Sequence, residues 1–262
     1  MNYCINFIND FKYIDEVSEI KIKVNEKTSQ DPRIFMRKFP NHRIVVDAED
    51  VSQFLIECLA AAKEEGIDFT LCIDKDSEFL SEIKNRKIPF FFRYYVNHWD
   101  LLQGFLLEGV TDMYIVEELG FELDKVYKVL NPENIKVRVF PDVAQASCDN
   151  LPELKSFFIR PEDMAIYAPY IDIIEFWTEE KLQETYYEIY AKDKKWFGLL
   201  NELIIGLNIS FELDSRYILP YFAERRVKCG KQCFKGGPCN ICDRIEKASK
   251  TFKDNGLLVK QI

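Results

Sequence analysis

Four cysteines near the end of the chain have the residue type and the spacing of a metal-binding segment. They fall within fourteen positions and are separated by three, five and two residues: Cys229, Cys233, Cys239 and Cys242. Two thiolates separated by two residues can reach one ion because the backbone between them turns tightly. Glycines at 230, 236 and 237 allow the turns that a loop around an ion requires. The sequence therefore predicts that these four cysteines hold a metal centre.

The spacing leaves the identity of the metal open. A closed set of four thiolates is typical of structural zinc, and a glycine-rich loop with four thiolates also suits a cubane iron–sulfur cluster. The other four cysteines have different surroundings. Cys4, Cys58 and Cys72 lie on apolar faces of predicted strands or helices, where packing explains them, and Cys148 lies in a predicted loop.

A second group of residues that could do chemistry is charged and lies in or after predicted strands. Arg93 and Arg138 each stand inside an apolar run, where a charge is costly unless it is paired or faces the mouth of a barrel. An arginine can hold a carboxylate or phosphate, and a nearby glutamate can pair with it or act as acid or base. We predict a substrate-binding site at the mouth of a barrel, formed by Arg93, Glu117, Arg138 and Glu175.

Two structural explanations compete with this site. Internal arginine–glutamate pairs can serve stability alone, and Asp47 and Asp74 can be helix caps. The two histidines, His42 and His98, are expected at the surface or in caps, and no residue is assigned a catalytic role.

The elements that position these residues alternate along the chain. Short runs rich in β-branched and aromatic residues are followed by stretches with helical period, which indicates a parallel sheet. The predicted strands cover residues 19–24, 43–47, 69–73, 89–96, 113–116, 135–140, 156–159 and 171–176. About eight strands favour a (β/α) barrel of the TIM type, and an open doubly wound sheet is the rival. Neither GxGxxG nor GxxxxGK[ST] occurs.

The pattern changes after residue 192. We predict a barrel-like domain over residues 1–192 and a C-terminal extension over residues 193–262 that packs on it. The extension begins with an apolar helix over residues 196–207, continues through the four cysteines and closes with a polar helix over residues 243–252.

Composition limits the class of protein. The net charge of -9 argues against non-specific binding of nucleic acid. The longest apolar runs are shorter than the roughly 18 residues that a membrane span needs, and the N-terminus lacks the features of a signal peptide. We therefore expect a cytoplasmic protein without a membrane partner, in which cysteines bind metal more readily than they form disulfides.

The middle of the chain, about residues 89–191, resembles the collagenase-like peptidase family U-thirty-two. The resemblance is carried by EGVTDMYIVEELGF at residues 108–121, IKVRVF at 135–140 and IDIIE at 171–175, followed by a tyrosine-rich helix. It implies a barrel-like fold. It also implies kinship with proteases and with iron–sulfur proteins that support hydroxylation of RNA or quinone precursors.

The chain departs from this family at several motifs. The His-Gly-x-x-Cys that follows the family's Val-Phe strand is replaced here by residues 141–148, which hold one cysteine. The lysine and glycine of the family's Lys-Ile-Glu-Gly strand are replaced by Ile173 and Phe176. The family's activity is therefore not carried over by default.

Three functions remain. The first is a metal-cluster enzyme, or a subunit of one, whose barrel mouth holds an RNA-derived or small anionic substrate. The second is a non-catalytic barrel that binds a protein partner and is stabilised by a structural zinc. The third is a peptidase, which ranks last because no pair of nucleophile and base is visible.

Overall fold

The computed structural model describes residues 2–7, 11–25, 31–144, 157–192, 196, 200–207 and 224. The four clustered cysteines, Cys148 and the predicted closing helix lie outside these residues.

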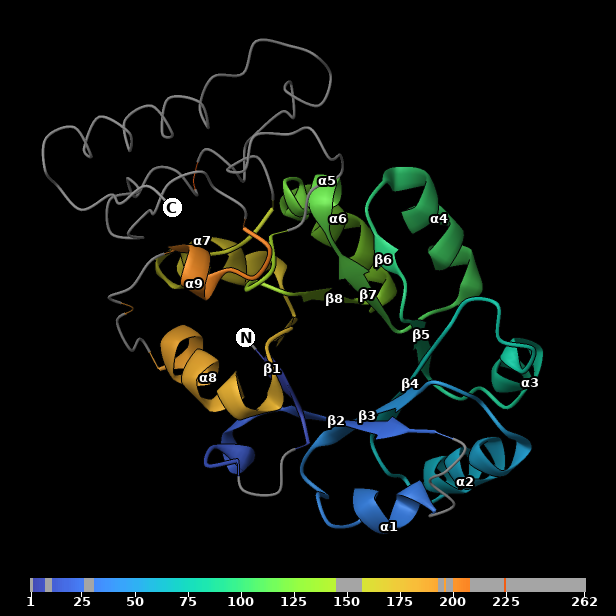
Figure 1. The fold of residues 1–262 in the computed structure, drawn as a ribbon. Helices are drawn as coiled ribbons and strands as arrows, with labels where there is room; N and C mark the ends of the chain where they lie inside the picture. The colour runs from blue at the N-terminus through green and yellow to red at the C-terminus, as the bar shows by residue number, and fades with distance from the viewer. Residues whose placement is uncertain are drawn as a thin grey trace, which may run out of the picture.

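Nine parallel strands form one sheet that wraps around a common axis (Figure 1). Their order is β5-β4-β3-β2-β1-β9-β8-β7-β6. The bounds are β1 Asn2–Asn6, β2 Glu19–Val24, β3 Arg43–Ala48, β4 Phe69–Ile73, β5 Phe90–Phe92, β6 Tyr95–Val96, β7 Asp112–Ile115, β8 Lys136–Val139 and β9 Ile173–Glu175.

One chain segment brings the two edges of this sheet together. Strands β5 and β6 are consecutive and are interrupted only at Arg93 and Tyr94, yet β5 pairs with β4 and β6 pairs with β7. The N–H of Thr111 donates to the carbonyl of Phe90 over 2.8 Å, which joins the start of β7 to β5. The sheet is therefore a nearly closed α/β barrel, as predicted, and the open-sheet alternative is wrong.

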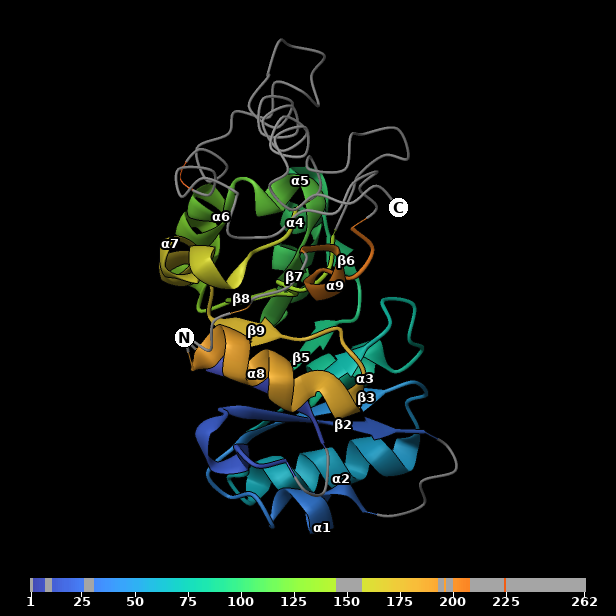
Figure 2. The ribbon, with the colours of Figure 1, turned by 60° about the vertical axis from the view of Figure 1, so that its left-hand side comes forward.

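Helices lie outside the ring of strands in both views (Figures 1 and 2). Two of them show why they begin and end where they do. Helix α2 starts after Ser52, whose hydroxyl accepts from the N–H of Leu55, and the chain leaves it through Gly66 at φ 75°. Helix α4 is capped by the ring of His98, and it ends at Gly109 at φ 73°. The helices are α1 Pro32–Met36, α2 Gln53–Glu64, α3 Leu80–Asn85, α4 Trp99–Glu108, α5 Glu117–Gly120, α6 Leu123–Leu130, α7 Met164–Tyr167, α8 Gln183–Ala191 and α9 Leu200–Leu203.

The predicted strand over residues 156–159 and the predicted helix over residues 196–207 differ from the structure, and one strand of the barrel, β1, was not predicted. Residues 157–159 are buried but form none of the named strands, and β1 takes a place in the barrel that the sequence did not assign to it. The apolar stretch after residue 196 contains only the short helix α9 among its described residues. Its Leu200, Leu203 and Ile204 are buried in the main core.

The described part of the extension is joined to the barrel by hydrogen bonds. The N–H of Ile205 donates to the carbonyl of Asp142 over 2.7 Å, and the hydroxyl of Tyr186 donates to the carbonyl of Leu203 over 2.9 Å. None of the helices in the described part of the chain is long and apolar enough to cross a membrane.

Alternation along the strands gives the barrel a charged interior. In β2 the side chains of Glu19 and Lys21 reach across to strands β7, β8 and β9, whereas Ile20 between them is buried in the apolar core. The same period of two directs Asp112 and Tyr114 of β7 inward. The strands therefore bury apolar residues toward the helices and polar residues inside the barrel.

Candidate functional site

The inward-facing side chains form a continuous network of alternating charge. Its first half lies toward the amino ends of the strands. There Arg43 contacts Glu19 over 3.0 Å and Asp112 over 2.8 Å. The guanidinium of Arg138 bonds the same two carboxylates, and its Nε lies 3.0 Å from Asp112. These four groups neutralise one another in the interior.

The second half lies toward the carboxyl ends, where barrel enzymes place their sites. The ammonium of Lys21 lies 2.7 Å from Glu175, and the hydroxyl of Tyr114 donates to the other oxygen of Glu175 over 2.7 Å. Lys21 also lies 3.5 Å from Asp47. Asp47 in turn accepts from Arg93 over 2.7 Å. A 3.5 Å contact between Arg138 and Glu175 joins the two halves.

The second half runs from the interior to the surface. The exposed fraction of the side chain rises from 4% at Glu175 through 10% at Lys21 and 30% at Arg93 to 52% at Asp74, which bonds Arg93 over 2.9 Å. A ligand in solvent can therefore reach the guanidinium of Arg93 directly. It can contact only the small exposed part of the Lys21 side chain. We call Lys21, Asp47, Arg93, Tyr114 and Glu175 the carboxyl-end cluster.

The pKa shifts show which protonation states the cluster keeps. Burial opposes the charge of Lys21, but the carboxylate of Glu175 and its other neighbours outweigh burial, so the pKa of Lys21 is raised well above its usual value. Burial, followed by the charge of Glu175, raises the pKa of Tyr114 as well. Burial opposes ionisation of Asp47, but Lys21 and Arg93 lower its pKa. Lys21 is thus held as a cation and Tyr114 as a proton donor.

These states limit the chemistry. An ammonium that is held charged stabilises a developing or bound negative charge and is a poor amine nucleophile. A phenol whose pKa is raised beside a carboxylate keeps its proton and donates a hydrogen bond, which here goes to Glu175. The carboxyl-end cluster is therefore suited to binding and polarising an anionic group.

The four predicted site residues occupy different surroundings. Arg93 and Glu175 both belong to the carboxyl-end cluster. Arg138 is fully buried, and its closest partners lie in the amino-end half. Glu117 follows β7 at φ 48°, a left-handed backbone conformation that is energetically unfavourable for any residue other than glycine. Its carboxylate accepts a hydrogen bond from the side-chain amide of Asn97 over 3.1 Å. The structure therefore joins Arg93 to Glu175 through Lys21 and Asp47 and places Glu117 in a separate contact.

Sequence reasoning missed Lys21 and Tyr114. It noted Asp47 and Asp74 as charges at strand ends but left them out of the predicted site, because they could be helix caps. Both aspartates bind Arg93 instead, and α2 is capped by Ser52. The signal for Lys21 was present, because Glu19, Lys21 and Lys23 alternate with isoleucines in β2. Glu19 and Lys21 are buried, so their charges require partners inside the barrel, whereas Lys23 at the carboxyl end of β2 is exposed.

An aromatic group borders the cluster near the carboxyl ends of the strands. Tyr114 stacks on Phe140 with ring centroids 4.9 Å apart, and Trp177 meets Phe140 edge to face at 5.3 Å. The turn that carries Trp177 is held by Asp142, whose carboxylate accepts from the N–H groups of Trp177 and Thr178. Burial raises the pKa of Asp142 to about 6.

The predicted metal ligands lie outside the described residues. Within the described part of the chain, no group of three or more His, Cys, Asp and Glu side chains is arranged to hold a metal ion. Cys4, Cys58 and Cys72 are buried there with free thiols, which fits the packing role predicted for them. Whether these four cysteines suit a metal is therefore judged from the chemistry of their side chains. Four thiols in a glycine-rich segment suit zinc or an iron–sulfur cluster.

No protein-family model matches the chain, and no curated protein matches its sequence.

Proposed function

We propose that this chain is a metal-binding barrel protein that acts on a small anionic or RNA-derived substrate at the carboxyl-end cluster. One observation carries the proposal. A chain of paired charges leads from buried Glu175 through Lys21 and Asp47 to exposed Arg93 at the end of the barrel where active sites form. An incoming anion can compete with Asp74, the most exposed partner, for Arg93.

Each group in the cluster has a role in this proposal. Arg93 binds the anionic group of the substrate because its guanidinium is the most exposed cation of the cluster. Lys21 stabilises negative charge that develops deeper in the mouth. Tyr114, whose hydroxyl donates to Glu175, helps to fix that carboxylate, and Glu175 orients Lys21.

The metal centre is proposed at Cys229, Cys233, Cys239 and Cys242. An iron–sulfur cluster would supply electron transfer or a Lewis-acidic iron, and zinc would stabilise the fold of the extension. The resemblance to the U-thirty-two family supports the iron–sulfur alternative, because that family includes iron–sulfur proteins that modify RNA or quinone precursors.

A specific observation favours the non-catalytic alternative, a protein-binding barrel with structural zinc. Every cation of the interior network already has a carboxylate partner, so the network is stable without a ligand. A peptidase remains the third candidate. Among the described residues the ring of His42 contacts the carbonyl of Ile14 and that of His98 caps α4, so neither activates a nucleophile.

The test is a comparison of cells that lack the chain with cells that carry it. Nucleosides from total RNA and small organic anions are measured by mass spectrometry. We expect one modified nucleoside or anion that disappears without the chain and returns with the wild type but not with Arg93→Gln. Arg86→Gln, which removes an exposed guanidinium paired with Glu82, is the control and should restore the product. Equal restoration by both variants, or no change in any species, would contradict the proposal.

A further inference from the structure

Three aromatic side chains gather at the carboxyl end of the barrel. Tyr95 of β6, Phe140 after β8 and Trp177 after β9 contact one another with ring centroids 5.3 to 6.0 Å apart. Phe140 and Trp177 each lie two positions beyond an inward-facing residue, Arg138 and Glu175. The period of two along a strand therefore directs both rings into the mouth of the barrel. We call Tyr95, Phe140 and Trp177 the aromatic half of the mouth.

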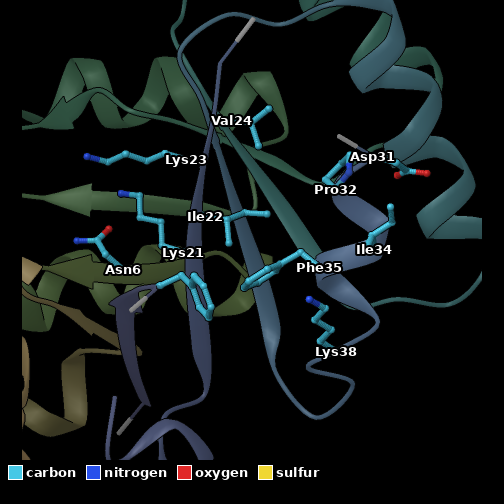
Figure 3. A pocket seen from close by; sticks show the side chains of 11 residues that line it. Asn6, Lys21, Ile22, Lys23, Val24, Asp31, Pro32, Ile34, Phe35 and Lys38 are labelled. Carbon is cyan, nitrogen blue, oxygen red and sulfur yellow. The ribbon is translucent and has the colours of Figure 1, made fainter. Parts of the chain in front are cut away.

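Strands β2 to β5 supply the charged half of the mouth. Arg93 and Asp47 belong to it, and Lys23 adds a further cation. Figure 3 shows the side chains of Lys21 and Lys23 on the same side of β2, opposite Ile22. Lys23 is exposed and is the register partner of Asp47 in β3. Because the sheet order keeps β2 to β5 apart from β9, β8 and β6, the aromatic and the charged side chains occupy different halves of one mouth.

Trp177 is held in place although it is open to solvent. It is 53% exposed, whereas Phe140 is buried. Its N–H donates to the carboxylate of Asp142 over 3.1 Å, and its ring packs against Phe140 and Tyr95. An exposed apolar ring gains free energy when a ligand covers it, and a ring that is already fixed costs little further entropy on binding. Trp177 therefore offers a preformed surface for stacking.

Tyr95 connects this surface to the carboxyl-end cluster. Its ring meets that of Tyr114 edge to face at 5.8 Å, and the hydroxyl of Tyr114 donates to Glu175. Burial raises the pKa of Tyr95 to about 12, and the nearby charges of Lys21 and Glu175 act on that pKa with opposite sign. A ligand that stacks on Trp177 therefore lies beside the charged groups of the cluster.

We infer that the substrate carries a planar ring and that this ring stacks on Trp177. The inference rests on the proposed function for the anionic group of the substrate, which Arg93 binds, and adds the class of its body. An aromatic side chain stacks on purines and pyrimidines alike, because every base has a π-face. Trp177 therefore selects substrates that have a ring over substrates that lack one.

Four probes test the inference on the full chain by titration calorimetry. Adenosine monophosphate and uridine monophosphate carry a ring and a phosphate, ribose 5-phosphate carries only the phosphate, and adenosine carries only the ring. We expect both monophosphates to bind at least about fivefold more tightly than ribose 5-phosphate, which is the usual effect of stacking one base on an aromatic side chain. Monophosphates that bind no more tightly than ribose 5-phosphate, or no binding of any probe, would overturn the inference.

Variants locate the ring. Trp177→Leu should weaken binding of adenosine monophosphate and adenosine by about fivefold or more and leave ribose 5-phosphate unchanged. Trp177→Phe keeps a ring and should retain most of the affinity. Phe54→Leu is the matched control, because Phe54 is 52% exposed and lies on α2 outside the barrel, and it should change no affinity. Equal effects of Trp177→Leu and Phe54→Leu on adenosine monophosphate would refute stacking on Trp177.

Arg93→Gln separates this inference from the proposed function. It should weaken binding of adenosine monophosphate and ribose 5-phosphate and leave adenosine unchanged. Equal binding of adenosine and its monophosphate, with both weakened by Trp177→Leu, would contradict the role of Arg93 and support the ring site. Monophosphate binding that is weakened by Arg93→Gln but not by Trp177→Leu would support the role of Arg93 and overturn the inference.

Discussion

The ammonium of Lys21 in β2 lies 2.7 Å from the carboxylate of Glu175 in β9, and strand β1 separates these two strands in the sheet. The ion pair therefore crosses one strand inside the barrel and connects residues 154 positions apart in the chain. It links an early strand to the last one, and with Tyr114 of β7 it forms the deepest part of the carboxyl-end cluster.

Removing one member of this pair should be costly. Lys21→Met leaves a buried carboxylate without its closest cation, and we expect it to lower the free energy of unfolding by about 3–5 kcal/mol. The double variant Lys21→Met/Glu175→Gln should be destabilised by less than the sum of the two single variants, with a coupling energy of more than about 1 kcal/mol. Urea unfolding of the four proteins measures this coupling. Additive effects would show that the two side chains do not interact.

The amino-end half of the network should serve stability. Arg138→Met leaves Glu19 and Asp112 buried with one cation fewer and should cost about 3–5 kcal/mol in the free energy of unfolding. Arg37→Met is the matched control, because Arg37 is 55% exposed in its pair with Glu65 and should cost less than about 1 kcal/mol. Similar losses in both variants, measured by urea unfolding, would disagree with a structural role that is specific to Arg138.

The buried carboxyl group of Asp142 should make stability depend on pH. Burial raises its pKa to about 6 in the folded chain, so the folded state holds this proton more tightly than the unfolded state. Its contribution to stability is complete below the unfolded pKa of about 4 and is lost as pH rises through about 6. The charged and titratable side chains that interact with it are Glu175, Tyr186 and Tyr190.

Comparison with Asp142→Asn isolates this effect. The stability of the wild type relative to the variant should be greater at about pH 4.5 than at about pH 7.5, by about 1–3 kcal/mol. A stability difference for Asp142→Asn that stays constant between the two pH values would refute the shifted pKa.

Two glycines offer a test of local packing. A Cβ at Gly120 would lie 2.5 Å from the ring of Phe157, so Gly120→Ala should destabilise the chain by about 1–3 kcal/mol through overpacking. A Cβ at Gly104 within α4 meets nothing within 4 Å, so Gly104→Ala should stabilise the chain by about 0.5–1 kcal/mol. Thermal unfolding of the two variants should show shifts of opposite sign, and shifts of the same sign would contradict the packing of α5 against Phe157.

The fold was largely predictable because its strands carry a clear period. Alternation over residues 19–24 and apolar runs over residues 43–47 and 69–73 mark strands that the structure contains. Residues 157–159 show the limit of this signal, since the run is buried and the N–H of Ile159 donates to the carbonyl of Pro141, yet it forms none of the named strands. An apolar run reports burial, whereas strand pairing depends on where the rest of the chain lies.

The candidate site was less predictable for a similar reason. A charge inside an apolar strand is visible in the sequence, as Arg93 and Arg138 are. The carboxylate with which such a charge pairs depends on strand order and register. Lys21 pairs with Glu175 because β1 lies between β2 and β9 in the sheet. The sequence therefore identified charged residues in strands but did not separate Arg138 in the amino-end half from Arg93 in the carboxyl-end half.

The metal content of the full chain, purified without oxygen, tests the central claim most directly. We predict about one zinc ion per chain, or iron and sulfide in the amounts of about one cluster per chain together with a brown colour. Cys239→Ser should lose most of this metal, because it removes one of four proposed thiolate ligands. Cys58→Ser, which changes a thiol buried in α2, should keep it. Neither zinc nor iron near one site per chain, or equal metal in the two variants, would contradict the claim that these four cysteines form a metal centre.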